Sequence, residues 1–166
     1  TRDQLDADLH AGLWGSMVQP LAGATGYWWW LHLHFDDRYG EYKALANFVA
    51  GEDFRAAQGE APLEPYVLPV ENDNNQLRAR VRCSAERAYL WVYHAQVPLR
   101  SGSFPVVPNT RVRLPNLKAG AYRVEYWDTR KGERRSETNV NHGGGPLVLP
   151  LPPIEGDVAA KIKLVK

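Results

Sequence analysis

The sequence predicts an α+β fold in which a helix–strand–helix segment is followed by an antiparallel β-sandwich of about eight strands. Two observations lead to this prediction. Residues 1–54 carry two stretches of helical periodicity around an aromatic run, whereas from Pro62 onward short alternating stretches are separated by turn residues. The change of pattern near residue 60 predicts two parts, residues 1–59 and residues 60–166, and 166 residues are enough for both.

The first helix is predicted from residue 1 to about residue 19. Its start has the Thr-Arg-Asp-Gln form of a capping box, and apolar side chains then recur at four-residue steps. These side chains belong to Leu5, Leu9, Leu13 and Met17. A second helix is predicted over residues 42–49, with Gly51 as the signal that ends it.

Between these helices we predict an extended strand over Gly23–Asp37, which reads GATGYWWWLHLHFDD. Side chains alternate along a strand, so Trp28 and Trp30 would share one face and Trp29 would lie on the other. An indole ring is flat, apolar and stiff, which suits stacking on the C–H face of a sugar. The tryptophans are therefore interpreted either as core residues or as a surface that meets a ligand.

The second part of the chain contains eight predicted strands. They span residues 66–70, 77–83, 88–95, 110–114, 121–128, 133–140, 147–151 and 158–165. In residues 77–83, apolar side chains alternate with arginines, which is typical of a half-buried strand with a basic outer face. The run over residues 88–95 has large side chains on both faces, which indicates a central strand.

Two rows of aromatic side chains each share one face of a strand. The rows are Tyr89, Trp91 and Tyr93, and Tyr122, Val124 and Tyr126. Either row could form a stacking platform for a polysaccharide, but sandwich cores use such rows as well, and we interpret both as core. Trp127 lies on the face opposite Tyr126 and is the better candidate for exposure and for contact with a sugar.

Composition excludes several classes of protein. A net charge of +1 gives no reason to expect nucleic acid or an anionic membrane as a partner. The single cysteine, Cys83, excludes an internal disulfide framework and a multi-cysteine metal site. No apolar run approaches the ~20 residues of a membrane span, and residues 1–20 lack the pattern of a signal peptide.

Residues 5–54 resemble the end of the (β/α)₈ barrel in clan-A glycoside hydrolases, especially the secreted apiosidase-like and cellulase-like members that carry a C-terminal β-sandwich. The resemblance rests on five stretches of sequence. They are residues 9–14 (LHAGLW), 23–30 (GATGYWWW), 42–48 (YKALANF), 117–122 (LKAGAY) and 126–132 (YWDTRKG). In that family the first three stretches belong to the seventh helix, the eighth strand and the eighth helix.

The resemblance implies a retaining glycosidase, in which one carboxylate is the nucleophile and a second is the acid/base. Those glutamates end the fourth and seventh barrel strands, so both would precede Thr1 and no catalytic residue is expected in this chain. Trp28 or Trp30 would form the floor of a sugar subsite. Hydroxyl-binding side chains would follow in the next loop, at His32, His34, Asp36 and Asp37. The family also implies a secreted or periplasmic protein, a polysaccharide or oligosaccharide partner, and no cofactor.

Two alternatives remain open. The chain could be a non-catalytic carbohydrate-binding module that presents its aromatic residues to a glycan. Alternatively, His32 and His34 would share a face of an extended strand and, together with Asp36, offer the ligand types of a Zn²⁺, Cu²⁺ or iron site. A lone aromatic strand would also have two bare edges, which predicts association with the missing barrel polypeptide or with a second copy.

Overall fold

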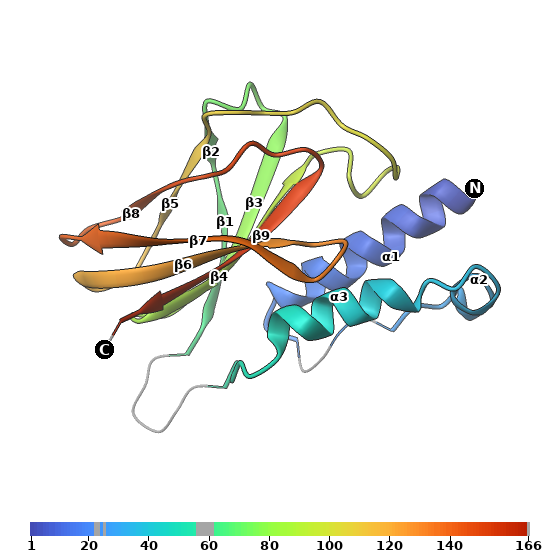
Figure 1. The fold of residues 1–166 in the computed structure, drawn as a ribbon, viewed down its shortest axis with the longest axis horizontal. Helices are drawn as coiled ribbons and strands as arrows, with labels where there is room; N and C mark the ends of the chain where they lie inside the picture. Colours follow the sequence, from blue (N-terminus) through green and yellow to red (C-terminus); the bar gives the residue numbers. More distant parts are fainter. Residues whose placement is uncertain (22–23, 25, 56–61, 166) are drawn as a thin grey trace.

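The computed structural model of the protein describes residues 1–21, 24, 26–55 and 62–165 (Figure 1). These residues contain three helices, α1 (Arg2–Met17), α2 (Trp30–Phe35) and α3 (Tyr39–Val49). They also contain nine strands: β1 (Glu64–Leu68), β2 (Val70–Glu71), β3 (Leu77–Cys83), β4 (Arg87–His94), β5 (Arg111–Leu114), β6 (Gly120–Asp128), β7 (Glu133–His142), β8 (Leu147–Pro150) and β9 (Asp157–Leu164). The predicted α+β fold with an antiparallel sandwich is confirmed. The predicted division at residues 59 and 60 falls outside the described ranges.

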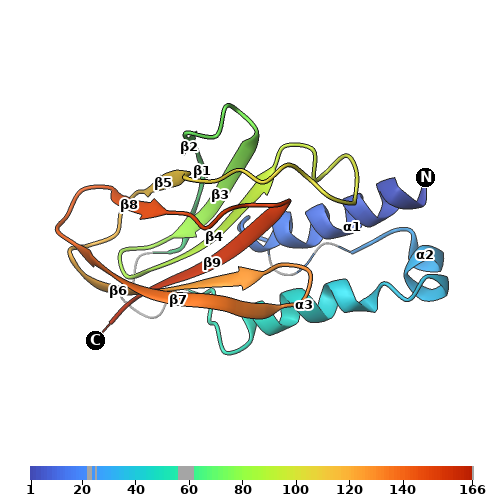
Figure 2. The same cartoon turned by 45° about the horizontal axis from the view of Figure 1, so that its top comes forward.

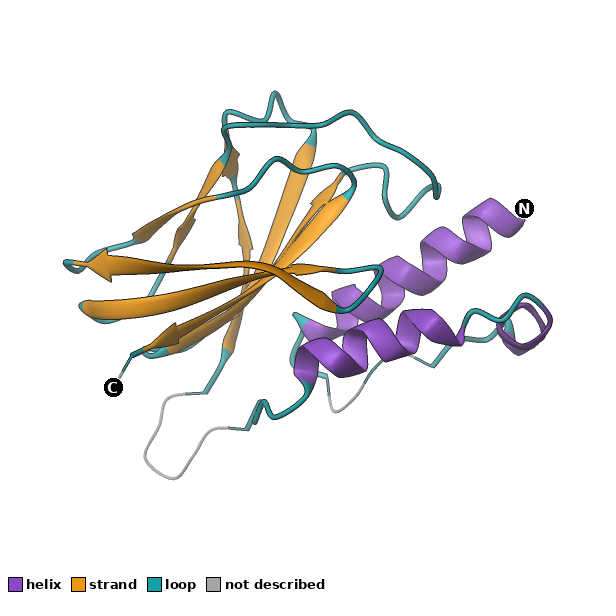
Figure 3. Cartoon of the chain, viewed as in Figure 1, coloured by secondary structure: helices purple, strands orange, loops and turns teal. Residues whose placement is uncertain are grey.

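The strands form two antiparallel sheets, coloured orange in Figure 3. The larger sheet has the order β1-β3-β4-β9-β6-β7, and the smaller sheet has the order β2-β5-β8. Alternate side chains of each strand meet in the core between the sheets, where Val81, Val124 and Leu149 are fully buried. The inward-facing apolar residues of the predicted strands are therefore what holds the two sheets together.

The helices cover the outer face of the larger sheet, so that its central strands are buried on both sides (Figure 2). Trp14 of α1 and Phe48 of α3 belong to the same buried cluster as Tyr89 and Trp91 of β4. Every residue of β4 after Arg87 is buried, which confirms the prediction of a central strand. The fold thus has three layers: the helices, the larger sheet in the middle, and the smaller sheet.

Both aromatic rows lie in the core, as we interpreted them from the sequence. The row on β4 lies beneath the helices, and its Trp91 and Tyr93 rings stack with centroids 4.0 Å apart. The row on β6 faces the smaller sheet, where the Tyr126 hydroxyl donates a hydrogen bond to the Pro150 carbonyl at 2.5 Å. Neither row is available as a stacking platform for a ligand.

The two long helices follow their local sequence signals. Thr1 caps α1, since its hydroxyl oxygen accepts a hydrogen bond from the backbone N–H of Gln4 at 3.3 Å. Beyond the end of α3, Gly51 adopts a φ of 74°, a left-handed conformation that suits glycine. Among the described residues, no helix is long and apolar enough to cross a membrane.

The predicted strand over Gly23–Asp37 is wrong wherever the structure describes it. Residues 27–29 are irregular, and α2 begins at Trp30. The Trp30 N–H donates to the Trp28 carbonyl at 2.9 Å, so these backbone groups pair locally. A lone strand would leave such groups without partners, and this cost overrides the strand propensity of tryptophan. Residues 23 and 25 of the predicted strand lie outside the described residues.

Candidate functional site

Three consecutive tryptophan side chains form an exposed aromatic patch at the α2 end of the helix layer. Trp28, Trp29 and Trp30 have 85%, 55% and 65% of their surface exposed. Together with Leu31 they line a hollow of about 240 Å³ whose walls are almost entirely apolar. We refer to these four residues as the tryptophan patch. Such a surface can stack against the apolar face of a ring or dock an apolar surface.

The tryptophan patch is held in place from both ends. On the N-terminal side, the Tyr27 hydroxyl donates a hydrogen bond to the Leu5 carbonyl of α1 at 2.6 Å. On the C-terminal side, the buried His32 ring lies between two carboxylates, with Nδ1 2.7 Å from Asp36 and Nε2 3.0 Å from Asp6. The indoles are therefore exposed on a segment that is anchored to α1.

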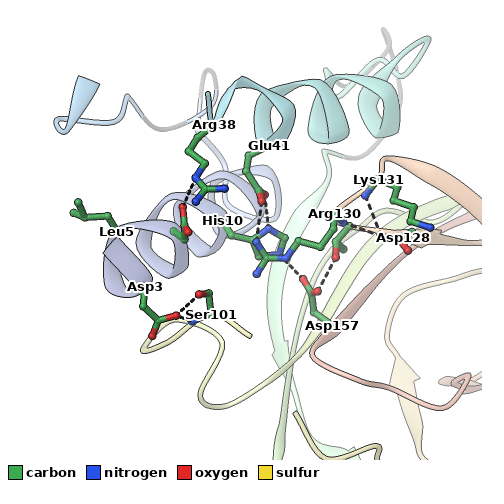
Figure 4. A network of polar contacts seen from close by, with 12 residues as sticks. Asp3, Leu5, His10, Arg38, Glu41, Ser101, Asp128, Arg130, Lys131 and Asp157 are labelled. Carbon is green, nitrogen blue, oxygen red and sulfur yellow. Dashed lines mark hydrogen bonds and ion pairs between the residues drawn. The ribbon is translucent and has the colours of Figure 1, made fainter. Parts of the chain in front are cut away.

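The polar atoms of His32 and Asp36 take part in the contacts that anchor this segment to α1. Asp6 also contacts the Arg38 guanidinium at 2.9 Å, and Arg2 lies 3.4 Å from Asp36 (Figure 4 shows the Arg38 contact). Each carboxylate is thus paired with a basic side chain within the protein. Of the polar residues that we predicted to bind sugar hydroxyls, these two act in the structure as links between α2 and α1.

His34 and Asp37 are exposed, and they follow the tryptophan patch within seven residues of chain. The His34 ring contacts Phe35 edge-on, with centroids 5.4 Å apart. Because His32 and His34 lie on a helix, their side chains point about 200° apart instead of sharing a face. The proposed metal site at this pair is wrong, and the described residues contain no group of three or more potential metal ligands.

Trp127 lies away from the tryptophan patch. Its half-buried ring contacts Phe48 of α3 with centroids 5.5 Å apart, and the Lys161 ammonium lies 4.5 Å from the ring centroid. The structure therefore places Trp127 in the seam between helices and sheet, where it joins the core formed by Tyr89 and Trp91. Of the predicted site residues, Trp28 and Trp30 line one hollow, and Trp127 does not belong to it.

A second polar cluster, which the sequence analysis missed, is buried between the helices and the larger sheet (Figure 4). His10 of α1 lies with Nδ1 2.7 Å from Glu41 of α3 and Nε2 2.8 Å from Asp157 of β9. Asp157 also accepts hydrogen bonds from Trp91 at 2.7 Å and Thr129 at 2.6 Å. We call this group the His10 cluster.

Charge and hydrogen bonding override burial in the His10 cluster. Burial alone lowers the pKa of His10, but the charge of Asp157 and the hydrogen bonds to Asp157 and Glu41 raise it above its ordinary value. Burial likewise opposes ionisation of Asp157, yet the His10 charge and three side-chain hydrogen bonds lower the pKa of Asp157 to about 2. The cluster is therefore an imidazolium between two carboxylates.

The position of His10 is the only sequence signal that points to this cluster. His10 lies on the same helical face as Leu13, Trp14 and Met17, and a histidine among core residues needs hydrogen-bond partners when it is buried. Its partners lie 31 and 147 residues away in the chain. No local pattern identifies Glu41 or Asp157.

No family model and no curated protein matches this sequence. Among solved structures, a monomeric β-xylosidase from Caulobacter crescentus CB15 is similar at 14% identity and a TM-score of 0.34, covering 56% of this chain and 27% of that chain. A Paenibacillus polymyxa xyloglucanase from glycoside hydrolase family 44 is similar at 10% identity and a TM-score of 0.34, covering 57% of this chain and 18% of that chain. The chain spans less than a third of the length of either enzyme.

Proposed function

We propose that this chain is the C-terminal portion of a secreted or periplasmic retaining glycoside hydrolase. In this proposal the tryptophan patch supplies the aromatic floor of a sugar subsite, and the β-sandwich is an accessory domain. The catalytic glutamates belong to polypeptide outside this sequence. The observation that carries the proposal is the exposure of three consecutive indoles on an anchored segment.

Burial energetics favour a ligand or partner at this position. Exposed apolar surface costs about 25 cal/mol per Å² relative to burial, and three adjacent tryptophans are a large local exposure. A sugar ring covers an indole with its C–H face and leaves its hydroxyls for polar groups at the rim. His34 and Asp37 are exposed and follow the patch in the chain, and they are the candidates for that rim.

The walls of the hollow are almost entirely apolar, so the remaining polypeptide must supply most of the polar contacts to a sugar. Trp28, Trp29, Trp30 and Leu31 line it, so hydrogen bonds to several sugar hydroxyls have to come from outside these four residues. A barrel that packs against α2 would place its own polar side chains and acids at this position. In this proposal, this chain supplies the aromatic floor of the subsite, and the barrel supplies the reactive carboxylates.

The test is retention on insoluble polysaccharides followed by affinity gel electrophoresis with soluble glycans. We expect weak retention that is lost in Trp28→Ala and in Trp30→Ala. Val67→Ala is the matched control, because Val67 is an exposed apolar residue on β1, away from the patch. Equal retention of Trp28→Ala and the parent chain would argue against a sugar-facing role for the indoles.

A non-catalytic carbohydrate-binding module is the second candidate. The helices share a buried cluster with β4 of the sandwich, and this observation favours a unit that presents the tryptophan patch by itself. Affinity separates the two candidates. A module binds a glycan in the micromolar range as an isolated chain, whereas a subsite floor gains affinity only when the catalytic polypeptide is added.

A further inference from the structure

A second cavity is lined by residues from the C-terminal ends of α1 and α3 and from the segments that follow them. Figures 1 and 2 show that these helix ends lie at the opposite end of the helix layer from α2. The cavity has a volume of about 250 Å³ and is open on one side. Its walls are mostly apolar and come from Met17, Leu21, Leu45, Val49 and Phe54. Strand β3 contributes the Arg82 side chain to this lining.

Arg82 has no acceptor for its buried Nε among the residues that the structure describes. Its guanidinium lies over the Phe54 ring, 5.3 Å from the ring centroid, so one face of the group is already covered. Burial lowers the pKa of Arg82, and the nearby charge of Arg87 lowers it further. A buried guanidinium N–H without an acceptor is unfavourable, and an anion in the cavity would relieve this cost.

The other charges around the cavity do not satisfy Arg82. Glu52 also lines the cavity, but its carboxylate is paired with Lys161 at 2.9 Å and Lys163 at 2.7 Å. The Tyr89 hydroxyl donates a third bond to Glu52 at 2.7 Å. Arg82 and the two lysines paired with Glu52 carry more positive charge than this one carboxylate balances, so the local charge favours an anionic ligand.

We propose that this cavity binds a small carboxylic acid with an apolar, ring-sized body. Its carboxylate accepts hydrogen bonds from the Arg82 guanidinium, which matches the planar geometry of a carboxylate. Its body packs against Phe54, Leu45 and Val49. An apolar cavity of about 150 Å³ holds one benzene ring, so 250 Å³ has room for a ring and a short acid chain.

Isothermal titration calorimetry with 3-phenylpropionate tests the proposal on the intact chain. The neutral comparison ligand is 3-phenylpropanamide, which keeps the body and removes the charge. We expect the acid to bind at least about tenfold more tightly than the amide, as charge-assisted hydrogen bonds predict. In Arg82→Met this preference should disappear, because the methionine retains the apolar stem without the guanidinium.

Arg80→Met is the matched control. Arg80 lies on the same face of β3, two residues away, and its Nε donates to the Tyr93 hydroxyl at 3.3 Å. This variant should keep the preference for the acid within about twofold of the parent chain. Val49→Phe fills the cavity and should weaken both ligands, which checks that binding occurs there and not at another surface.

Three results would overturn the proposal: no saturable binding of the acid, equal binding of acid and amide, or equal loss in Arg80→Met and Arg82→Met. The tryptophan patch does not line this cavity, so Trp28→Ala should leave binding of the acid unchanged. Failure here therefore leaves the carbohydrate proposal untouched, and failure of glycan retention leaves this proposal untouched.

Discussion

His10 on the first helix is paired with Asp157 on the last strand, with Nε2 and a carboxylate oxygen 2.8 Å apart across 147 residues of chain. His10 is fully buried, and its second ring nitrogen contacts Glu41 of α3. Since carboxylate oxygens only accept, both ring nitrogens donate and the ring is charged. One side chain thus connects both long helices to the larger sheet.

The stability of the protein should fall as the pH rises above neutrality. The folded-state pKa of His10 is raised, so its contribution is complete below the unfolded value of about 6.5 and is lost as the pH rises through the folded value. The pKa of Asp157 is lowered to about 2 and that of Glu41 is also lowered. Their contribution is complete above the unfolded values of about 4 and is lost on acidification.

Urea unfolding at a series of pH values measures this dependence. We expect the free energy of unfolding to be highest between about pH 5 and 6.5, where all three groups are charged. His10→Gln should flatten the alkaline side of the profile, whereas His34→Gln, at an exposed position, should leave its shape unchanged. A parent profile that is flat from pH 6 to 9 would contradict the charged state of His10.

Gly132→Ala should destabilise the docking of the β6–β7 turn against α3. A methyl group at this position would lie 2.5 Å from the Ala44 Cα, and the φ of 65° is unfavourable for alanine. Left-handed strain costs about 1 kcal/mol or more, and the contact with backbone adds to it. Thermal and urea unfolding measure the loss.

Gly51→Ala is the control for Gly132→Ala. Gly51 has a similar φ of 74°, but a methyl group there meets no atom within 4 Å. The two variants share the conformational cost, so the difference between them measures the contact with α3. Equal destabilisation by Gly132→Ala and Gly51→Ala would mean that Gly132 does not pack closely against α3.

His32→Ala should open α2 without unfolding the sandwich. The side chain links Asp36 within α2 to Asp6 of α1, and its removal leaves both carboxylates with one partner fewer. The loss of buried, charge-assisted hydrogen bonds is worth about 1–3 kcal/mol. Amide hydrogen exchange should show lost protection at Leu33 and Asp36, with β4 unaffected.

His34→Ala serves as the comparison on the same helix. His34 is exposed and contacts only Phe35 among the described interactions, so its removal should change the free energy of unfolding by less than about 0.5 kcal/mol. Equal loss of protection in both variants would show that His32 does not anchor the helix.

The tryptophan patch should drive association of the isolated chain at high concentration. Exposed contiguous apolar surface favours self-association, and each of the three indoles is more than half exposed. We expect sedimentation to show concentration-dependent association that a Trp28→Ser, Trp29→Ser and Trp30→Ser triple variant abolishes. The stability of this variant should remain within about 1 kcal/mol of the parent chain.

Leu99→Ser provides the control for that measurement. Leu99 is an exposed apolar side chain outside the patch, so it tests general surface hydrophobicity. A parent chain that is monomeric at all concentrations would be inconsistent with an unpartnered patch. Association that persists in the triple variant would point to another surface.

The sequence predicted α1, α3 and the sandwich strands because their signals are local. A capping threonine and apolar spacing define α1, and period-two alternation defines β3 and its neighbours. It mispredicted Trp30–Phe35 as a strand because the aromatic composition favours strands while the anchoring contact of His32 lies on another helix. The metal site considered at His32 and His34 was wrong for the same reason, because it assumed that the two side chains share a face of a strand.

By itself, the sequence determined where the two long helices and the sandwich strands run, and which of their faces are apolar. Only the tertiary structure decided the polar contacts that join the layers, such as His10 with Asp157, and the exposure of Trp28. The physical reason is the distance along the chain over which each kind of interaction acts. Periodicity and capping act within a few residues, whereas burial of a charge or an indole depends on groups that the fold brings together from distant parts of the chain.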